Sequence, residues 1–186
     1  MRCCGVCNMA WDSLKSDYRY RIPGSLIVEE YLLKNHNISV PEKRAGNVEG
    51  IIITGVPVHN IFNSDLSDYD DAKEYVRKTT GDGFIPHFYD GMKSTWQVLD
   101  FDDCWQRSDG LANSKTICIA GVISDTEFTV PANAVAFRDI QVLTAYILHK
   151  FKLPIASVKV AKECPEYIKS RWKEFKTGVK QQMKKM

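Results

Sequence analysis

The clearest pattern along the chain is a set of short, β-branched runs bounded by glycine or turn residues. Gly50–Gly55 has the sequence Gly-Ile-Ile-Ile-Thr-Gly, which is typical of a strand buried on both faces in the middle of a sheet. Residues 115–123 form a second strongly apolar strand, and Val158–Val160 a short third one. Residues 84–89 and 94–99 flank an Asp-Gly turn and predict a hairpin.

Segments between these runs predict helices. Ser25 is placed to cap a helix over residues 26–33, and residues 65–80 carry acids first and bases last, as a helix dipole prefers. Residues 131–152 and 166–180 have apolar positions at helical spacing. The order of elements predicts an α/β fold with one central mixed β-sheet flanked by helices.

Length and composition predict one folded domain without a membrane-spanning segment. The chain has 186 residues, of which 44% are hydrophobic, and a net charge of +2. Nearly balanced charge argues against a nucleic-acid partner, and no apolar run approaches the roughly 20 residues of a membrane span. The first ten residues lack the apolar block of a signal peptide, so we expect the protein to stay in the cytoplasm where it is made.

The chain has six cysteines. Because the sequence shows no secretion signal, we expect reduced thiols rather than a disulfide framework. Cys3, Cys4 and Cys7 crowd the N-terminus, where a single C-x-x-C without a second pair is a weak zinc motif and a tail that docks a partner is favoured. We therefore expect residues 1–24 to form an irregular arm and residues 25–186 to form the domain.

Candidate chemistry begins with Thr54, because open α/β sheets place ligands and catalytic groups at the carboxyl ends of their strands. Several blocks follow in order: residues 34–41 leading into 48–54, Ile85-Pro-His-Phe-Tyr89, Trp96-Gln-Val-Leu99, Trp105 with Ser108-Asp-Gly110, residues 114–120, and Lys162-Glu-Cys-Pro165 followed by Arg171-Trp-Lys-Glu-Phe175. Together they resemble the type-2 N-acetylmuramoyl-L-alanine amidases, the fold of many phage lysins and peptidoglycan recognition proteins. The resemblance implies an amidase-like fold.

The same resemblance implies a zinc site held by two His and one Cys, which activates water to cleave an amide. In this chain Cys164 matches the Cys ligand, and Lys162 matches a lysine that stabilises the oxyanion. The His positions fall on Thr54 and, eight residues before Cys164, on Ala156. A further loop His falls on Gln106, and a supporting Glu falls on Ala120. We expect Thr54, Ala156 and Cys164 to cluster at one end of the sheet.

Two readings of function remain open. The favoured one is a catalytically inactive amidase-like protein, phage-derived, that binds a cell-wall fragment or acts as a virion or structural interaction module. Its candidate binding residues are Thr54, His87, Trp105 and Gln106. It needs no cofactor, and its partners are a peptidoglycan fragment or other phage or host proteins, in the cytoplasm of the bacterial host or in the virion.

The alternative is a divergent, active zinc amidase of the endolysin type. It would use Lys162 in catalysis and would draw its metal ligands from Cys164, Cys118 and His87. Cys118 lies two residues before Ala120 and therefore on the same face of its strand. Against this reading, each of the three candidates also has a structural role open to it: Cys118 as a small buried apolar residue, Cys164 as a packing residue, and His87 as a hydrogen-bonded strand histidine.

Overall fold

The computed structural model describes residues 16–36, 42–55, 85–91, 94–104, 115–123, 130–162 and 164–186, with the side chains of residues 130–132 left out. Its elements, in chain order, are β1 (Tyr18–Arg21), β2 (Ile27–Glu30), the 3-10 helix η2 (Leu33–His36), β3 (Glu42–Lys43), β4 (Gly50–Gly55), β5 (Phe88–Asp90), β6 (Thr95–Gln97), β7 (Asp103–Cys104), β8 (Thr116–Gly121), α2 (Val130–Lys150), the 3-10 helix η5 (Ile155–Ser157), β9 (Val158–Val160), α3 (Glu166–Ser170) and α4 (Trp172–Met183).

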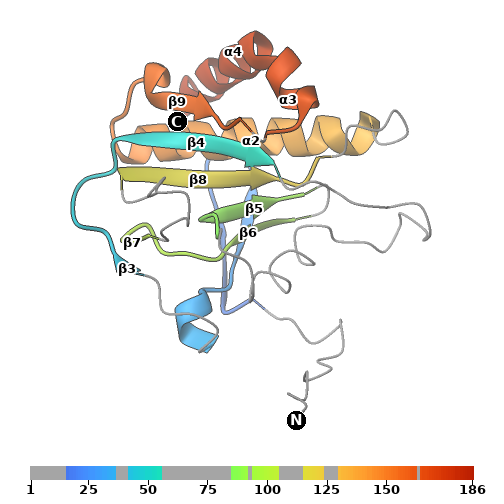
Figure 1. Ribbon diagram of the computed structural model, residues 1–186. Coiled ribbons are helices and arrows are strands. Elements are labelled where there is room, and N and C mark those ends of the chain that lie inside the picture. The colour runs from blue at the N-terminus through green and yellow to red at the C-terminus, as the bar shows by residue number, and fades with distance from the viewer. Residues whose placement is uncertain are drawn as a thin grey trace, which may run out of the picture.

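A mixed sheet of seven strands forms the centre of the described structure, in the order β1-β2-β6-β5-β8-β4-β9 (Figure 1). Strands β4, β5, β8 and β9 run parallel through their β5–β8, β8–β4 and β4–β9 pairings. The β5–β6 and β1–β2 pairs are antiparallel, and β2 runs parallel to β6. The predicted α/β fold with a central mixed sheet is confirmed.

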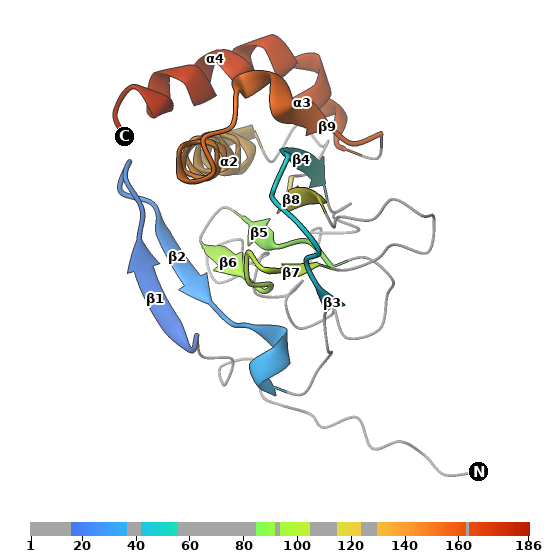
Figure 2. The same ribbon diagram turned by 90° about the vertical axis from the view of Figure 1, so that its left-hand side faces the viewer.

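Helix α2 packs on one face of this sheet, and α3 and α4 pack beyond it (Figure 2). The core beneath α2 joins Ile51 and Ile53 of β4 to Ile117 and Ile119 of β8, all 0% exposed. A smaller cluster that includes Tyr89, Trp96 and Ala120 lies on the opposite face. Strand β8 is therefore buried on both sides, as the sequence predicts for a central strand, and β4 is buried except at the half-buried Ile52 and Gly55.

Two glycines let segments approach the ends of β4 closely. A Cβ on Gly50 would lie 2.8 Å from the carbonyl oxygen of Ser157, and a Cβ on Gly55 would lie 1.8 Å from Cδ of Pro165. Any larger residue at these positions would collide with the backbone of η5 or with a proline ring. The glycines that bracket the apolar run thus admit the segments before and after β9.

Several predicted elements differ in the structure. The helix predicted over residues 26–33 is wrong, because Ile27–Glu30 form strand β2. The chain turns at Gly24 (φ 93°) and Ser25 (φ 67°), and β-branched Ile27 and Val28 pair with β1 and β6. Strand β1 lies inside the segment predicted to be irregular, so that prediction is wrong for Tyr18–Arg21. The division of the chain into an arm and a domain stays a prediction, and residues 1–15 lie outside the described structure.

Other elements agree with the pattern or cannot be compared with it. The strands predicted at residues 50–55, 115–123 and 158–160 appear as β4, β8 and β9, and the hairpin appears as β5 and β6. The helix predicted over residues 166–180 is divided into α3 and α4 at Arg171. The helix predicted over residues 65–80 lies outside the described residues. Of the helices described, none is long and apolar enough to cross a membrane.

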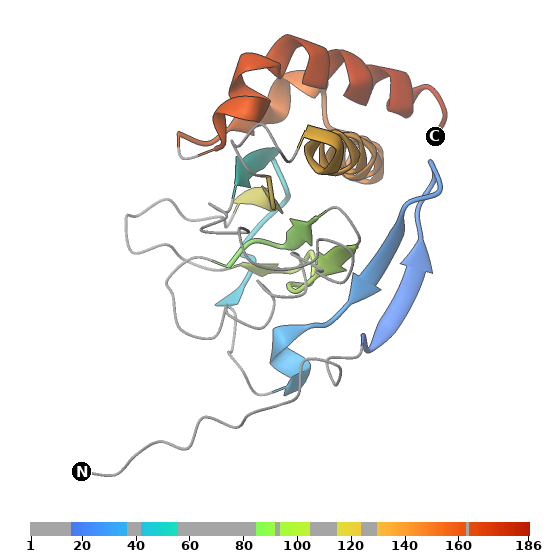
Figure 3. The same ribbon diagram turned by 90° about the vertical axis from the view of Figure 1, so that its right-hand side faces the viewer.

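Strands β1 and β2 form a ribbon along one side of the molecule, between η2 and the C-terminal end of α4 (Figure 3). Cys104, Cys118 and Cys164 are buried thiols outside any disulfide, which confirms the expectation for these three. The N-terminal cysteines fall outside the described residues.

Candidate functional site

Thr54 ends the apolar run of β4 and lies between two neighbouring strand ends. It is in register with Ala120 of β8, and on the other side the amide of Ala161 donates to the carbonyl of Ile53 at 2.8 Å. Its side chain is 1% exposed. The three positions Thr54, Ala120 and Ala161 therefore sit side by side at the carboxyl end of the parallel strands, where α/β sheets bind ligands.

Alternation along the strands separates Thr54 from Cys164. Ile51 and Ile53 face the core beneath α2, so Ile52 and Thr54 face the opposite side. Cys164 is 2% exposed and belongs to the core beneath α2. Pro165, the next residue, packs against Gly55. Thr54 and Cys164 therefore lie at the same end of the sheet but belong to different faces.

Ala156 does not join them, and the predicted cluster of Thr54, Ala156 and Cys164 is wrong. Ala156 is exposed and lies in η5, which precedes β9. Because β9 runs parallel to β4, with Ile51 opposite Val158, η5 lies at the amino end of β4, the end away from Thr54. Counting eight residues back from Cys164 passes the whole of β9, and the residue beside Thr54 is Ala161 instead.

His87 is buried just before β5 with both ring nitrogens engaged by the protein. Its Nδ1 accepts from the amide of Cys118 at 3.2 Å, and its Nε2 lies 3.1 Å from the carbonyl oxygen of Asp103 and 2.9 Å from Nη2 of Arg44. Because Nδ1 accepts, the neutral ring carries its proton on Nε2 and donates it to Asp103. Burial, and secondly the charge of Arg44, lower the pKa of His87 from 6.5 to about 3.

This arrangement makes His87 a structural residue of the described part of the protein, with neither nitrogen facing a ligand. Cys118 lies beside it, on the face of β8 that also carries Ala120, whereas Cys164 lies in the core on the other side of the sheet. The three candidate metal ligands are therefore not brought together. Among all described residues, no group of three His, Cys, Asp or Glu side chains is placed to hold a metal ion.

Of the remaining predicted site residues, only Lys162 is described. It follows β9 at the same end of the sheet as Thr54, and it is exposed. Its main-chain carbonyl accepts a hydrogen bond from the ammonium group of Lys169 in α3. Trp105 and Gln106 lie outside the described residues.

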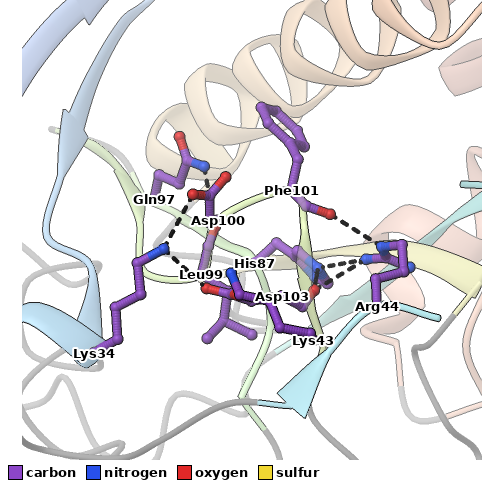
Figure 4. A network of polar contacts seen from close by, with 9 residues as sticks. All are labelled: Lys34, Lys43, Arg44, His87, Gln97, Leu99, Asp100, Phe101 and Asp103. Atoms are coloured by element: carbon purple, nitrogen blue, oxygen red, sulfur yellow. Dashed lines mark hydrogen bonds and ion pairs between the residues drawn. The ribbon is translucent and has the colours of Figure 1, made fainter. Parts of the chain in front are cut away.

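The structure also contains a polar network around Asp103 that no sequence pattern indicates (Figure 4). The Asp103 carboxylate is 1% exposed and pairs with Nζ of Lys43 at 2.5 Å and Nζ of Lys34 at 3.2 Å. Lys34 also reaches Asp100 at 3.1 Å, so these ion pairs connect η2 and β3 to β7 and the loop before it. Arg44 donates through Nε to the carbonyl of Phe101 at 3.0 Å. No motif links these residues, because they come from segments about 60 residues apart.

The residues at the end of the sheet do not fit the zinc site that the resemblance implies. Ala120 and Ala161 have no donor atom, and Thr54 offers a buried hydroxyl, which is a poor zinc ligand. Among the described residues, Cys164 brings a thiol to this end of the sheet, and it lies in the core beneath α2. We therefore derive no catalytic step through zinc from the described residues.

Comparison with solved structures identifies the fold. A mutant endolysin from Bacillus subtilis matches with 21% identity and a TM-score of 0.60, over 83% of this chain and 99% of that one. The catalytic domain of XlyA matches with 22% identity and a TM-score of 0.54, over 82% and 98%. The Staphylococcus aureus hydrolase AmiA, solved in complex with its ligand, matches with 11% identity and a TM-score of 0.60, over 92% and 86%.

The protein therefore has the amidase-like fold of endolysin catalytic domains, and the resemblance seen in the sequence is confirmed at the level of the fold. At identities this low, similarity of fold does not carry over the activity of these proteins. No family model matches the chain, and no curated protein matches it.

Proposed function

We propose that this protein is a catalytically inactive member of the amidase-like fold that binds a peptidoglycan fragment at the carboxyl end of its sheet. The observation that carries the proposal is the trio Thr54, Ala120 and Ala161. These neighbouring strand ends present no imidazole, thiol or carboxylate to the place where the fold binds ligands. Without metal ligands, this end of the sheet lacks the Lewis acid for hydrolysis.

The similar structures support a role at the cell wall. They include endolysins, and one hydrolase is solved with its ligand. Lys162 adds an exposed ammonium group to the same end of the sheet as the buried hydroxyl of Thr54, and this ammonium group is suited to the hydroxyls and carboxylates of a glycan with peptide stems. Trp105 and Gln106 stay candidate contacts on the strength of the sequence alone. A phage origin, with the protein in the virion or the host cytoplasm, belongs to the same proposal.

A second candidate is a divergent zinc amidase with a shifted site. It is favoured by the similarity to catalytic domains and by Cys164, which precedes Pro165 as in the family pattern. This candidate requires Cys164 to leave the core beneath α2 in order to meet a metal. Replacement of Cys164 by Ser would then abolish lysis and lower the metal content.

Co-sedimentation with purified peptidoglycan sacculi tests the binding role, with a parallel pull-down against virion proteins. We expect the protein to sediment with sacculi without releasing stem peptides. Lys162→Ala should weaken this retention, whereas Lys173→Ala, an exposed lysine on α4, should not. If the protein captures virion proteins and is not retained on sacculi, the proposed cell-wall binding is refuted and a role in virion assembly is supported.

A further inference from the structure

A cavity of about 450 Å³ opens at the end of the sheet opposite Thr54. It is bounded by residues that lead into β4, by the loop before β7 and by the end of α2. Sites for small molecules measure roughly 300 to 1,000 Å³, so the cavity has the size of a ligand site. Because it lies at the amino ends of the parallel strands, it is separate from the site proposed above.

The charge of its lining is mostly positive. Arg44, Lys150 and Lys152 line the cavity, and Asp102 is the acidic residue among the lining residues. The surplus is two positive charges, reduced by the partial negative charge of roughly one half at the C-terminal end of α2. A phosphate monoester carries about −1.5 to −2 at pH 7 and matches this surplus better than a single carboxylate does.

One of these cations is held in position by the fold. The guanidinium group of Arg44 is half-buried, and its Nη2 donates to the carbonyl oxygens of Asp103 at 3.2 Å and Thr116 at 3.3 Å. With Nε on the carbonyl of Phe101, the side chain bridges two segments, residues 101–103 and the start of β8. Such a group loses little further freedom when an anion binds, and guanidinium groups suit phosphate oxygens.

The walls of the cavity also carry apolar surface. Phe101 and Phe151 both line it, and their rings meet edge to face with centroids 5.3 Å apart. The ammonium group of Lys150 lies 5.1 Å from the centroid of Phe101. A ligand that joins a phosphate to an apolar ring or chain would use both features, whereas inorganic phosphate would use one.

Lys152 provides an independent indication of function. It has a φ of 55°, just beyond the end of α2, where the amide of Leu153 donates to the carbonyl of Leu148 at 2.9 Å. Glycine is the usual residue at this left-handed position after a helix, because it has no Cβ to strain. Here the position carries a lysine that lines the cavity. Residues held in unfavourable backbone conformations concentrate at functional sites.

We propose that this cavity binds an organic phosphate, with the phosphate group held by Arg44, Lys150 and Lys152 and the organic part packed against Phe101 and Phe151. The site goes beyond the proposed cell-wall role and does not depend on it, because the two sites lie at opposite ends of the sheet.

Isothermal titration calorimetry at low salt with phenyl phosphate as the probe tests this proposal. We expect saturable binding about tenfold tighter than that of inorganic phosphate, and none with benzyl alcohol. Adenosine 5′-monophosphate and glycerol 1-phosphate, titrated separately, distinguish a nucleotide from a polyol phosphate as the source. Absence of saturable binding of phenyl phosphate at millimolar concentration, or equal affinity for inorganic phosphate, would overturn the proposal.

Lys152→Gly separates function from stability. The variant should bind phenyl phosphate about tenfold more weakly while its Tm stays unchanged or rises by about 2 °C, since the strained position is relieved. Ser25→Gly is the matched control, because Ser25 is the other non-glycine residue with positive φ in the described chain, at 67°, and it lies away from the cavity in the turn before β2. Equal binding by wild type and Lys152→Gly, or equal weakening by both variants, would refute a role for this cation.

Discussion

The buried, neutral state of His87 makes the stability of this protein depend on pH. The unfolded chain takes up a proton at His87 below its ordinary pKa of 6.5, whereas the folded chain does so only near pH 3. Because folding lowers the pKa of His87, the folded state becomes less stable as the pH falls from about 6.5 towards 3. Each pH unit in this window costs about 1.4 kcal/mol, so His87 alone lowers the free energy of unfolding by about 2 kcal/mol at pH 5.

This magnitude depends on the pKa of the unfolded chain, because the folded value lies well below 5. Arg44 faces Nε2 and the amide of Cys118 faces Nδ1, and both oppose a charged ring. The carbonyl of Asp103 and the charges of Asp103 and Asp100 favour the charged ring, but they do not outweigh burial and Arg44. The His87→Gln variant removes the titration, whatever its effect on stability at pH 7.5. We expect its free energy of unfolding to fall by about 2 kcal/mol less than that of wild type between pH 7.5 and pH 5.

Urea unfolding followed by tryptophan fluorescence measures the difference. Burial is the main cause of the raised pKa values of Glu30 and Asp139, and these two groups make the folded state more stable as the pH falls. Their effect is common to wild type and variant. It cancels when the two pH dependences are subtracted. His149→Gln, at an exposed site in the last turn of α2, is the control for replacing a histidine by glutamine. If wild type and His87→Gln lose the same free energy over this range, the buried neutral histidine is refuted.

Further substitutions test the packing and the polar network. Gly55→Ala should destabilise the fold by about 2 kcal/mol in urea unfolding, because its Cβ would lie 1.8 Å from a proline ring, whereas Gly46→Ala meets nothing within 4 Å and should be close to neutral. Asp103→Asn should cost about 1.5 to 2 kcal/mol, because the buried carboxylate loses its charged hydrogen bonds with Lys34 and Lys43, whose own side chains are 31% and 70% exposed, while Glu49→Gln breaks an exposed pair worth less than about 1 kcal/mol. Cys164→Ser should lower stability by about 1 to 2 kcal/mol and leave the zinc content measured by mass spectrometry unchanged. Equal effects within either matched pair, or loss of zinc in the last variant, would contradict these assignments.

Local patterns predicted the centre of the fold and not its edges. The β-branched run of β4 and the long apolar helix α2 are specified by their own residues, since each is buried against several neighbours. The sequence of strand β2 does not distinguish it from a helix, because its four residues are too few to separate a helical period from that of a strand. Its pairing with β6, which lies almost 70 residues further along the chain, decides its structure.

The site shows the same division. Thr54 at a strand end was predicted from a local pattern, and its place beside Ala120 follows from two adjacent parallel strands. The prediction for Ala156 is wrong because it relies on the number of residues before Cys164, and this number does not show where β9 begins and ends. The network of Lys43, Arg44 and Asp103 depends on contacts between distant segments, for which the sequence carries no spacing signal.

The most direct test of the central claim is a combined measurement of zinc content and stem-peptide release on the wild-type protein. The protein is incubated with zinc and desalted, its metal content is measured by mass spectrometry, and the same sample is mixed with peptidoglycan sacculi. The account predicts zinc far below one ion per chain and no release of stem peptides. One zinc ion per chain together with released stem peptides would contradict it, and would show that this fold keeps a catalytic site despite Thr54, Ala120 and Ala161.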